Sequence, residues 1–201
     1  MQPFVLRSAR VALEVPTRGD LAEIVASCRD PEVQRWTTVP VPYGPEEAER
    51  FLDRVVDAGW ATDREWTWGV RAPGSSELVG VVSVRRRHRD LGFWLAPSGR
   101  GRGLATDAVR LVCDHVLAEG WPDVLWEGHV GNDASAAVAR RAGFRYEGVV
   151  RGLHPGRERT GPHPLCWRAR LLPTDDRAPK PGWPAAGAPV PTATDPAPEA
   201  P

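Results

Sequence analysis

Cysteine and long apolar runs are scarce in this sequence. The 201 residues include three cysteines, Cys28, Cys113 and Cys166, an odd number at no spacing typical of a metal site. We therefore expect neither a disulfide framework nor a bound metal, and we interpret the three thiols as packing residues in a reducing compartment. No segment approaches the roughly 20 apolar residues that cross a bilayer, so we expect a soluble, cytoplasmic protein without a membrane partner.

An excess of either charge is also absent, since 26 Lys and Arg residues balance 26 Asp and Glu residues. Without a net positive field, general attraction to nucleic acid or to anionic lipid is not expected, and any basic site must be local. Internal repeats are lacking as well. With 41% hydrophobic residues, the length suits one globular domain with a sizeable core.

Large apolar residues nearly disappear from residues 173–201, where Pro, Ala, Thr and Asp dominate and Trp183 is the one aromatic residue. Such a segment buries too little apolar surface to offset the entropy of an ordered chain. We therefore expect one folded domain over residues 1–174, followed by a Pro/Ala-rich disordered tail over residues 175–201.

Residue patterns before the tail predict strands and helices in mixed order. Helices are expected over residues 21–28, 46–58, 104–118 and 134–141, with Asp20 as the N-cap of the first and Gly59 ending the second. Strands are expected over residues 10–15, 66–71, 78–84, 91–96, 124–130, 144–151 and 165–172. Residues 30–43 contain three prolines and predict a short helix followed by an extended loop that covers a site.

The chain is organised around residues 91–105, where an apolar strand ends at Pro97 and a Gly/Arg-rich turn opens a helix. The glycines of this turn allow a close approach of the backbone to a ligand, and the first N–H groups of the helix point to the same place. A pyrophosphate suits this layout, although a solvated basic turn is the alternative. The residues of the turn are Arg100, Gly101, Arg102, Gly103, Leu104 and Ala105.

Three motifs occur together on these elements: Leu95-Ala96-Pro97 before the turn, Asn132-x-x-Ser135, and Gly143-Phe144. In this combination the chain resembles the GNAT superfamily of N-acetyltransferases from about residue 10 to residue 172. Residues 30–36 and Glu147-Gly148 further resemble the branch that contains the ribosomal-protein alanine and serine N-acetyltransferases. The resemblance implies an α+β fold, in which helices flank a mostly antiparallel sheet that is splayed at a cleft for acyl-CoA.

The same resemblance implies acetyl-CoA as the co-substrate, with its pyrophosphate on the turn and its pantetheine along the splayed strand. Backbone groups would hold the pantetheine as an added strand, and the N–H of Leu95 would hold the thioester oxygen during attack. Asn132 would contact pantetheine, or else serve only as a turn residue. The implied acyl-CoA contacts are Trp94, Leu95, Pro97, Arg100, Gly101, Arg102, Gly103, Leu104, Ala105, Asn132 and Ser135.

Ser135 is the residue that the resemblance implies as the proton donor to the departing thiolate. A hydroxyl that only stabilises the start of a helix is the alternative. Many GNAT enzymes carry a tyrosine acid seven residues after the asparagine, where this sequence has Ala139. The departure leaves Ser135 as the remaining candidate for this role.

Several side chains compete as the base that takes a proton from the amine. Glu127 and His129 share one face of a predicted strand, although a solvated face is the plain interpretation. His154 follows a later strand, near where relatives carry a carboxylate, and histidine titrates in the useful range. Glu147 matches a position common in the branch, where a structural role is the alternative.

Trp36 and Tyr43, together with Trp94, are candidates to line the acceptor pocket, with core packing as the alternative because the chain has nine tryptophans. The leading function is acetyl transfer from acetyl-CoA to a primary amine, either a protein N-terminus or a small molecule such as an aminoglycoside. The alternatives are transfer of another acyl group and a non-catalytic module that binds or senses acyl-CoA.

Overall fold

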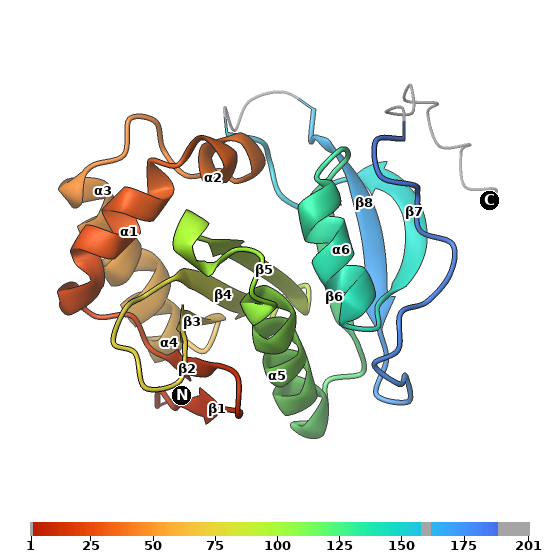
Figure 1. The fold of residues 1–201 in the computed structure, drawn as a ribbon, viewed down its shortest axis with the longest axis horizontal. Helices are drawn as coiled ribbons and strands as arrows, with labels where there is room; N and C mark the ends of the chain where they lie inside the picture. The colour runs from red at the N-terminus through yellow and green to blue at the C-terminus, as the bar shows by residue number, and fades with distance from the viewer. Residues whose placement is uncertain (1, 158–161, 189–201) are drawn as a thin grey trace.

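The structure is a computed structural model that describes residues 2–157 and 162–188. Within these residues, eight strands form one sheet in the order β1-β2-β3-β4-β5-β6-β8-β7 (Figure 1). The strands are β1 (Leu6–Arg7), β2 (Ala12–Glu14), β3 (Glu65–Arg71), β4 (Gly80–Arg85), β5 (Asp90–Leu95), β6 (Val124–His129), β7 (Arg145–Arg151) and β8 (Leu165–Leu171). Every pair is antiparallel except β5 and β6, which run parallel. The mostly antiparallel sheet confirms the expected α+β fold.

Helices flank the sheet, with α5 (Leu104–Ala118) and α6 (Asp133–Arg141) in contact with each other and lying in front of it in Figure 1. The apolar stripe of α5 places Val109, Val112 and Val116 in the core, each with at most 1% of its surface exposed. The other helices are α1 (Leu21–Cys28), α2 (Pro31–Trp36), α3 (Pro45–Phe51) and α4 (Ala58–Ala61). The bounds of α5 and α1 are those predicted from the sequence.

Two details of the first helices differ from prediction. Asp20 is at the N-cap position of α1, as predicted, but its side chain makes no capping bond there. It instead completes a capping box with Thr17, which is the N-cap of a 3-10 turn over Arg18–Asp20 that precedes α1. Gly59 does not end the helix predicted over residues 46–58, because α3 continues as a π-helix over Leu52–Asp57 and then as α4. A Cβ atom at position 59 would lie 2.6 Å from the carbonyl oxygen of Glu65, so this glycine allows close packing.

The sheet divides where β5 and β6 separate. They pair only at Asp90 with Leu125 and at Leu91 with Trp126, whereas β5 pairs with β4, and β6 with β8, along their full lengths. Residues 92–95 therefore have no strand beside their outer edge in the part of the chain that the structure describes. The predicted splay of the sheet is confirmed, and it opens on the side where α5 begins.

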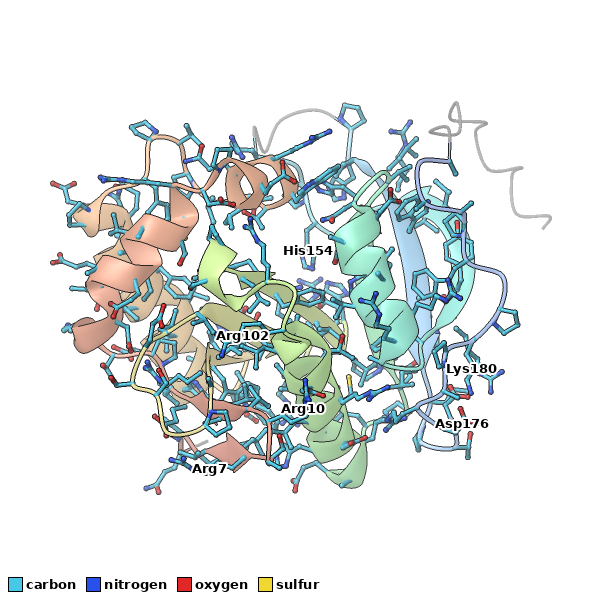
Figure 2. The ribbon with its side chains drawn as sticks, viewed as in Figure 1. Arg7, Arg10, Arg102, His154, Asp176 and Lys180 are labelled. Atoms are coloured by element: carbon cyan, nitrogen blue, oxygen red, sulfur yellow. The ribbon has the colours of Figure 1, made fainter. Side chains whose placement is uncertain are left out.

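Residues 173–188 contact the domain, contrary to the prediction of a disordered tail, and we call them the C-terminal strap. The side chain of Asp175 is fully buried and accepts a bond of 2.6 Å from Arg145. Arg177 pairs with Asp114 of α5 at 2.5 Å, and Lys180 pairs with Asp176 within the strap (Figure 2). The prediction missed the strap because it counted apolar residues, whereas ion pairs and Trp183 hold this segment. Residues 189–201 of the expected tail lie outside the described residues.

We expect truncation after Leu172 to lower the melting temperature by roughly 5 °C or more, since several ion pairs and a half-buried tryptophan are lost. Truncation after Ala188 leaves these contacts in place and is the matched control. Differential scanning calorimetry of both variants checks the prediction. An unchanged melting temperature after truncation at Leu172 would show that the strap adds nothing to stability.

Two further properties concern the described residues only. None of their helices is both long and apolar enough to cross a membrane. No three of their His, Cys, Asp and Glu side chains come together as the ligands of a metal ion. The three cysteines are buried and unpaired, as predicted, and burial raises the pKa of the Cys28 thiol to about 11.

Candidate active site

A cleft with a volume of about 1340 Å³ follows the split between β5 and β6. The glycine turn lies at one part of its lining, and the loop after β7 contributes His154, which lies between β5 and α6 in Figure 2. Pro97 and Arg102, both expected as ligand contacts, do not line it. The predicted site residues that do line the cleft are Trp36, Tyr43, Trp94, Leu95, Arg100, Gly101, Gly103, Leu104, Ala105, Glu127, His129, Asn132, Ser135 and His154.

The glycine turn has the conformation of an anion-binding loop. Gly101 and Gly103 have φ angles of +72° and +80°, and α5 begins directly after Gly103. In this left-handed conformation residues with a side chain are strained, so glycine is required. The free N–H groups at the start of a helix of 15 residues then face the cleft. These donors fit a pyrophosphate.

Arg10 supports this turn from the distant connection between β1 and β2. Its guanidinium donates to the carbonyl of Arg102 at 3.1 Å and to Asp107 at 2.6 Å, and Figure 2 shows Arg10 beside the start of α5. Arg10 therefore ties the turn to the first turn of α5, with its charge paired to Asp107. Sequence reasoning missed it, because nothing in the sequence links two residues more than 90 positions apart.

The outer edge of β5 offers backbone groups to a ligand. The backbone N–H of Ala96 donates to the carbonyl of Val79, next to β4, at 2.9 Å. In an antiparallel pair of strands, residues whose N–H and C=O groups bond to the neighbouring strand alternate with residues whose groups point away from it. The N–H and C=O groups of Phe93 and Leu95 therefore point into the split. Phe93 lies closer to the point where the strands separate, and sequence reasoning missed it as a donor.

Trp94 corrects one prediction, because the same alternation directs its backbone toward Val81 of β4. It can contact a ligand only through its side chain. Arg100 also differs from the expected arrangement, since its guanidinium donates to Leu95 O at 3.0 and 3.2 Å and pairs with Asp30 at 2.5 Å. In this structure Arg100 therefore occupies a carbonyl that a bound pantetheine would use.

Asn132 and Ser135 come together at the start of α6. The side-chain oxygen of Asn132 accepts the backbone N–H of Ser135 at 3.1 Å, so Asn132 is the N-cap of the helix. Its NH₂ group makes no bond among the described residues and remains a donor toward the cleft. Ala139, seven residues after Asn132, lies within α6 and is fully buried. Ser135 lines the cleft.

Glu127 is engaged by structural bonds rather than free to take a proton. Its Oε1 accepts two bonds from Arg168, at 2.9 and 2.6 Å, and its Oε2 accepts the backbone N–H of Leu153 at 2.7 Å. Both oxygens are occupied and the side chain is 8% exposed, which argues against the predicted role as a base. Glu127 instead fixes the loop that carries His154.

The other candidate bases differ in their surroundings. Glu147 pairs with Arg170 at 2.7 Å and does not line the cleft, which agrees with a structural role. His129 lines the cleft, and burial lowers its pKa. Among residues 2–157 and 162–188, neither residue has a partner that orients it as a base.

His154 is oriented by a buried carboxylate. Its Nε2 lies 2.8 Å from Oδ2 of Asp90, which also accepts Arg85 Nε at 2.8 Å. Burial alone would raise the pKa of Asp90, but hydrogen bonds from His154 and Arg85 outweigh burial and hold it at about 2. Asp90 is therefore ionised at neutral pH and favours a proton on Nε2, which leaves Nδ1 as the acceptor. Asp90 and Arg85 were missed because this stretch resembles a solvated basic turn.

We expect Asp90→Asn to flatten the acid dependence of stability. The folded-state pKa of about 2 lies below the ordinary value of about 3.9, so ionised Asp90 stabilises the fold above pH 4 and this contribution is lost as the pH falls toward 2. The free energy of unfolding of the variant should be lower by on the order of 2 kcal/mol at pH 7, and it should change less between pH 4 and pH 2. Urea unfolding at each pH measures the difference; parallel curves for both proteins would contradict the assignment.

Trp36 and Tyr43 have different positions in the lining. The ring of Trp36 lies 3.7 Å from where a Cβ atom of residue 131 would be, and its indole N–H donates to Glu32 at 2.9 Å. Tyr43 is 4% exposed, and burial raises the pKa of its hydroxyl. Tyr43 therefore agrees with the packing alternative, and Trp36 is the better placed of the two for contact with an acceptor.

The chain is similar to known acetyltransferases. The sequence model described as "Acetyltransferase (GNAT) domain" matches residues 10–145. "Probable N-acetyltransferase YjcK" of Bacillus subtilis (strain 168) is 31% identical over 96 residues, which cover 44% of this chain and 53% of that protein. The ribosomal-protein-serine acetyltransferase of Escherichia coli (strain K12) is 31% identical over 81 residues, 37% of this chain and 45% of that protein. The match thus spans about half the length of these relatives.

Solved structures share the fold at lower identity. The microcin C7 self-immunity acetyltransferase MccE, in complex with acetyl-CoA and AMP, superposes with a TM-score of 0.69 at 17% identity, over 82% of this chain and 93% of that one. At this identity the likeness concerns the arrangement of strands and helices. The split sheet and its helices are thus those of solved acetyltransferase structures.

Proposed function

The chain belongs to the GNAT acetyltransferase family, and on that premise we propose that it transfers the acetyl group of acetyl-CoA to a primary amine by direct attack. One observation carries the proposal: a single cleft joins an anion-binding turn, a free strand edge and an imidazole oriented by a carboxylate. The acyl donor and a proton acceptor thereby meet in one space. Such proximity is what direct transfer between two substrates requires.

Backbone groups hold the acyl donor in this proposal. The N–H groups of Gly101, Gly103 and the first turn of α5 bind the pyrophosphate, with Arg10 nearby. The edge of β5 binds the pantetheine amides as an added strand, which displaces Arg100 from Leu95 O. The N–H of Phe93 or Leu95 donates to the thioester oxygen and stabilises the negative charge that develops on it.

Two side chains move protons. His154 takes a proton from the amine through Nδ1, directly or through water, as the nitrogen bonds to the acetyl carbon. The carbon–sulfur bond then breaks with its electron pair on sulfur, and Ser135 donates a proton to that thiolate as it takes one from water. His154 afterwards releases the amine proton to solvent. Asp90 keeps the imidazole oriented, and Glu127 holds its loop.

A protein N-terminus is the acceptor that we propose first, because the Escherichia coli relative is named for acetylation of a ribosomal protein. A small-molecule amine is the second candidate. The reducing environment expected from three unpaired, buried cysteines supports a cytoplasmic substrate.

A panel of amines tests the function. The protein is incubated with acetyl-CoA and with peptides that begin with Ser or Ala, or with small amines, and a thiol reagent measures free CoA. We expect release that depends on one class of amine. Release only from a longer acyl-CoA would favour a different acyl group, and binding without release for any amine would favour a binding module; either result would contradict acetyl transfer.

A further inference from the structure

Trp126 of β6 contacts the proposed proton donor. Its indole is 1% exposed, and its Nε1 lies 3.3 Å from Oγ of Ser135. The ring lies along the strand over Gly128, because a Cβ atom at position 128 would come within 2.4 Å of Cζ2 of Trp126. The absence of a side chain at Gly128 thus allows the indole to reach the start of α6.

This bond determines what the Ser135 hydroxyl can do. Indole N–H is only a donor, so Ser135 Oγ accepts from Trp126 and its own hydrogen must point elsewhere. No other bond involves Oγ among the described residues, and Ser135 lines the cleft. A hydroxyl that accepts one hydrogen bond is also a better donor in the next. Trp126 thereby leaves the Ser135 proton available to a thiolate in the cleft.

The C-terminal strap also contacts Trp126. The ring of Trp183 lies 5.6 Å from that of Trp126 and 5.4 Å from that of Tyr146, between ring centres, and its indole N–H donates to Phe144 O at 3.3 Å. Farther along, Gly187 N donates to Asp133 in the first turn of α6 at 2.9 Å. The strap, dark blue in Figure 1, therefore contacts both elements that meet at Ser135.

We propose that Trp126 is a positioning residue that orients the Ser135 hydroxyl, and that the strap holds Trp126 in place through Trp183. This inference rests on the proposed role of Ser135 in acetyl transfer. The inference assigns to the C-terminal strap an effect on turnover, in addition to its effect on stability.

A double-mutant cycle tests the proposal on the full-length protein, with kcat and the KM for acetyl-CoA measured for each variant. Ser135→Ala should lower kcat by about 100-fold or less. Trp126→Phe keeps a ring but loses the donor, and should lower kcat roughly fivefold to tenfold, the size of one neutral hydrogen bond. The double variant should be no slower than Ser135→Ala, and KM for acetyl-CoA should stay unchanged throughout.

Two further variants separate positioning from stability. Trp183→Ala keeps the Trp126 side chain and its N–H donor but removes the ring that packs against it, so it keeps the test possible where Trp126→Phe does not fold. It should lower kcat a few-fold on its own and not at all in the Ser135→Ala background. Trp121→Phe, in a separate aromatic cluster, should lower only the melting temperature.

The outcomes distinguish the two proposals. An unchanged kcat in Ser135→Ala would overturn both the role of Ser135 and this inference. A loss of kcat in Ser135→Ala without any loss in Trp126→Phe, or losses that multiply in the double variant, would overturn this inference alone.

Discussion

Gly103→Val should raise the dissociation constant of acetyl-CoA by at least about 100-fold while the domain stays folded. The φ angle of +80° disfavours any side chain, and a β-branched one most. The new Cβ atom would also lie 3.0 Å from Arg10 Nη2. The turn must therefore change conformation, which turns its N–H groups away from the pyrophosphate.

Isothermal titration calorimetry with acetyl-CoA measures this effect, and Gly74→Val is the matched control. Gly74 has a φ angle of +74°, and a Cβ atom at this position would have no other atom within 4 Å. It lies in the connection between β3 and β4, away from the cleft lining. Valine is disfavoured to a similar degree at both positions, because the two φ angles are similar. Equal affinity for acetyl-CoA in the two variants would contradict the assignment of the glycine turn.

His154→Gln should lower kcat/KM by about 100-fold or more at neutral pH, because general-base contributions run from about 10² to 10⁴. Glutamine can still bond to Asp90, but it cannot accept a proton. A general base acts only in its unprotonated form, so kcat/KM of the unchanged protein should rise with pH. That rise should be absent in the variant with the same amine.

His88→Gln is the control for this experiment. The His88 ring lies 6.1 Å from that of His154 but does not line the cleft, so its loss should change neither the rate nor the pH profile. A pH profile of His154→Gln that matches the unchanged protein would show that another group takes the proton.

The elements that the sequence predicted well carry their information locally. The apolar spacing of α5 and the glycine turn before it are read within one stretch of chain, and the bounds of that helix agree with the structure. The splay of the sheet was implied by resemblance. The π-helix after α3 was not predicted, because its residues have the same apolar spacing as an ordinary helix.

The contacts that the sequence could not predict join distant residues. Asp90 and His154 are 64 positions apart, and the pairings of β5 with β6, β6 with β8 and β8 with β7 bring them together. Trp183 likewise seemed isolated in a polar tail, although Trp126 and Tyr146 provide its contacts. Single side chains at such junctions leave no periodic signal in the sequence.

Mass spectrometry of the amine after incubation with acetyl-CoA tests the central claim most directly. We predict one added acetyl group, on the amine nitrogen, with the unchanged protein and with the controls Gly74→Val and His88→Gln, and almost none with Gly103→Val or His154→Gln. Acetylated product that forms equally with all five proteins, or with none, would contradict transfer in this cleft.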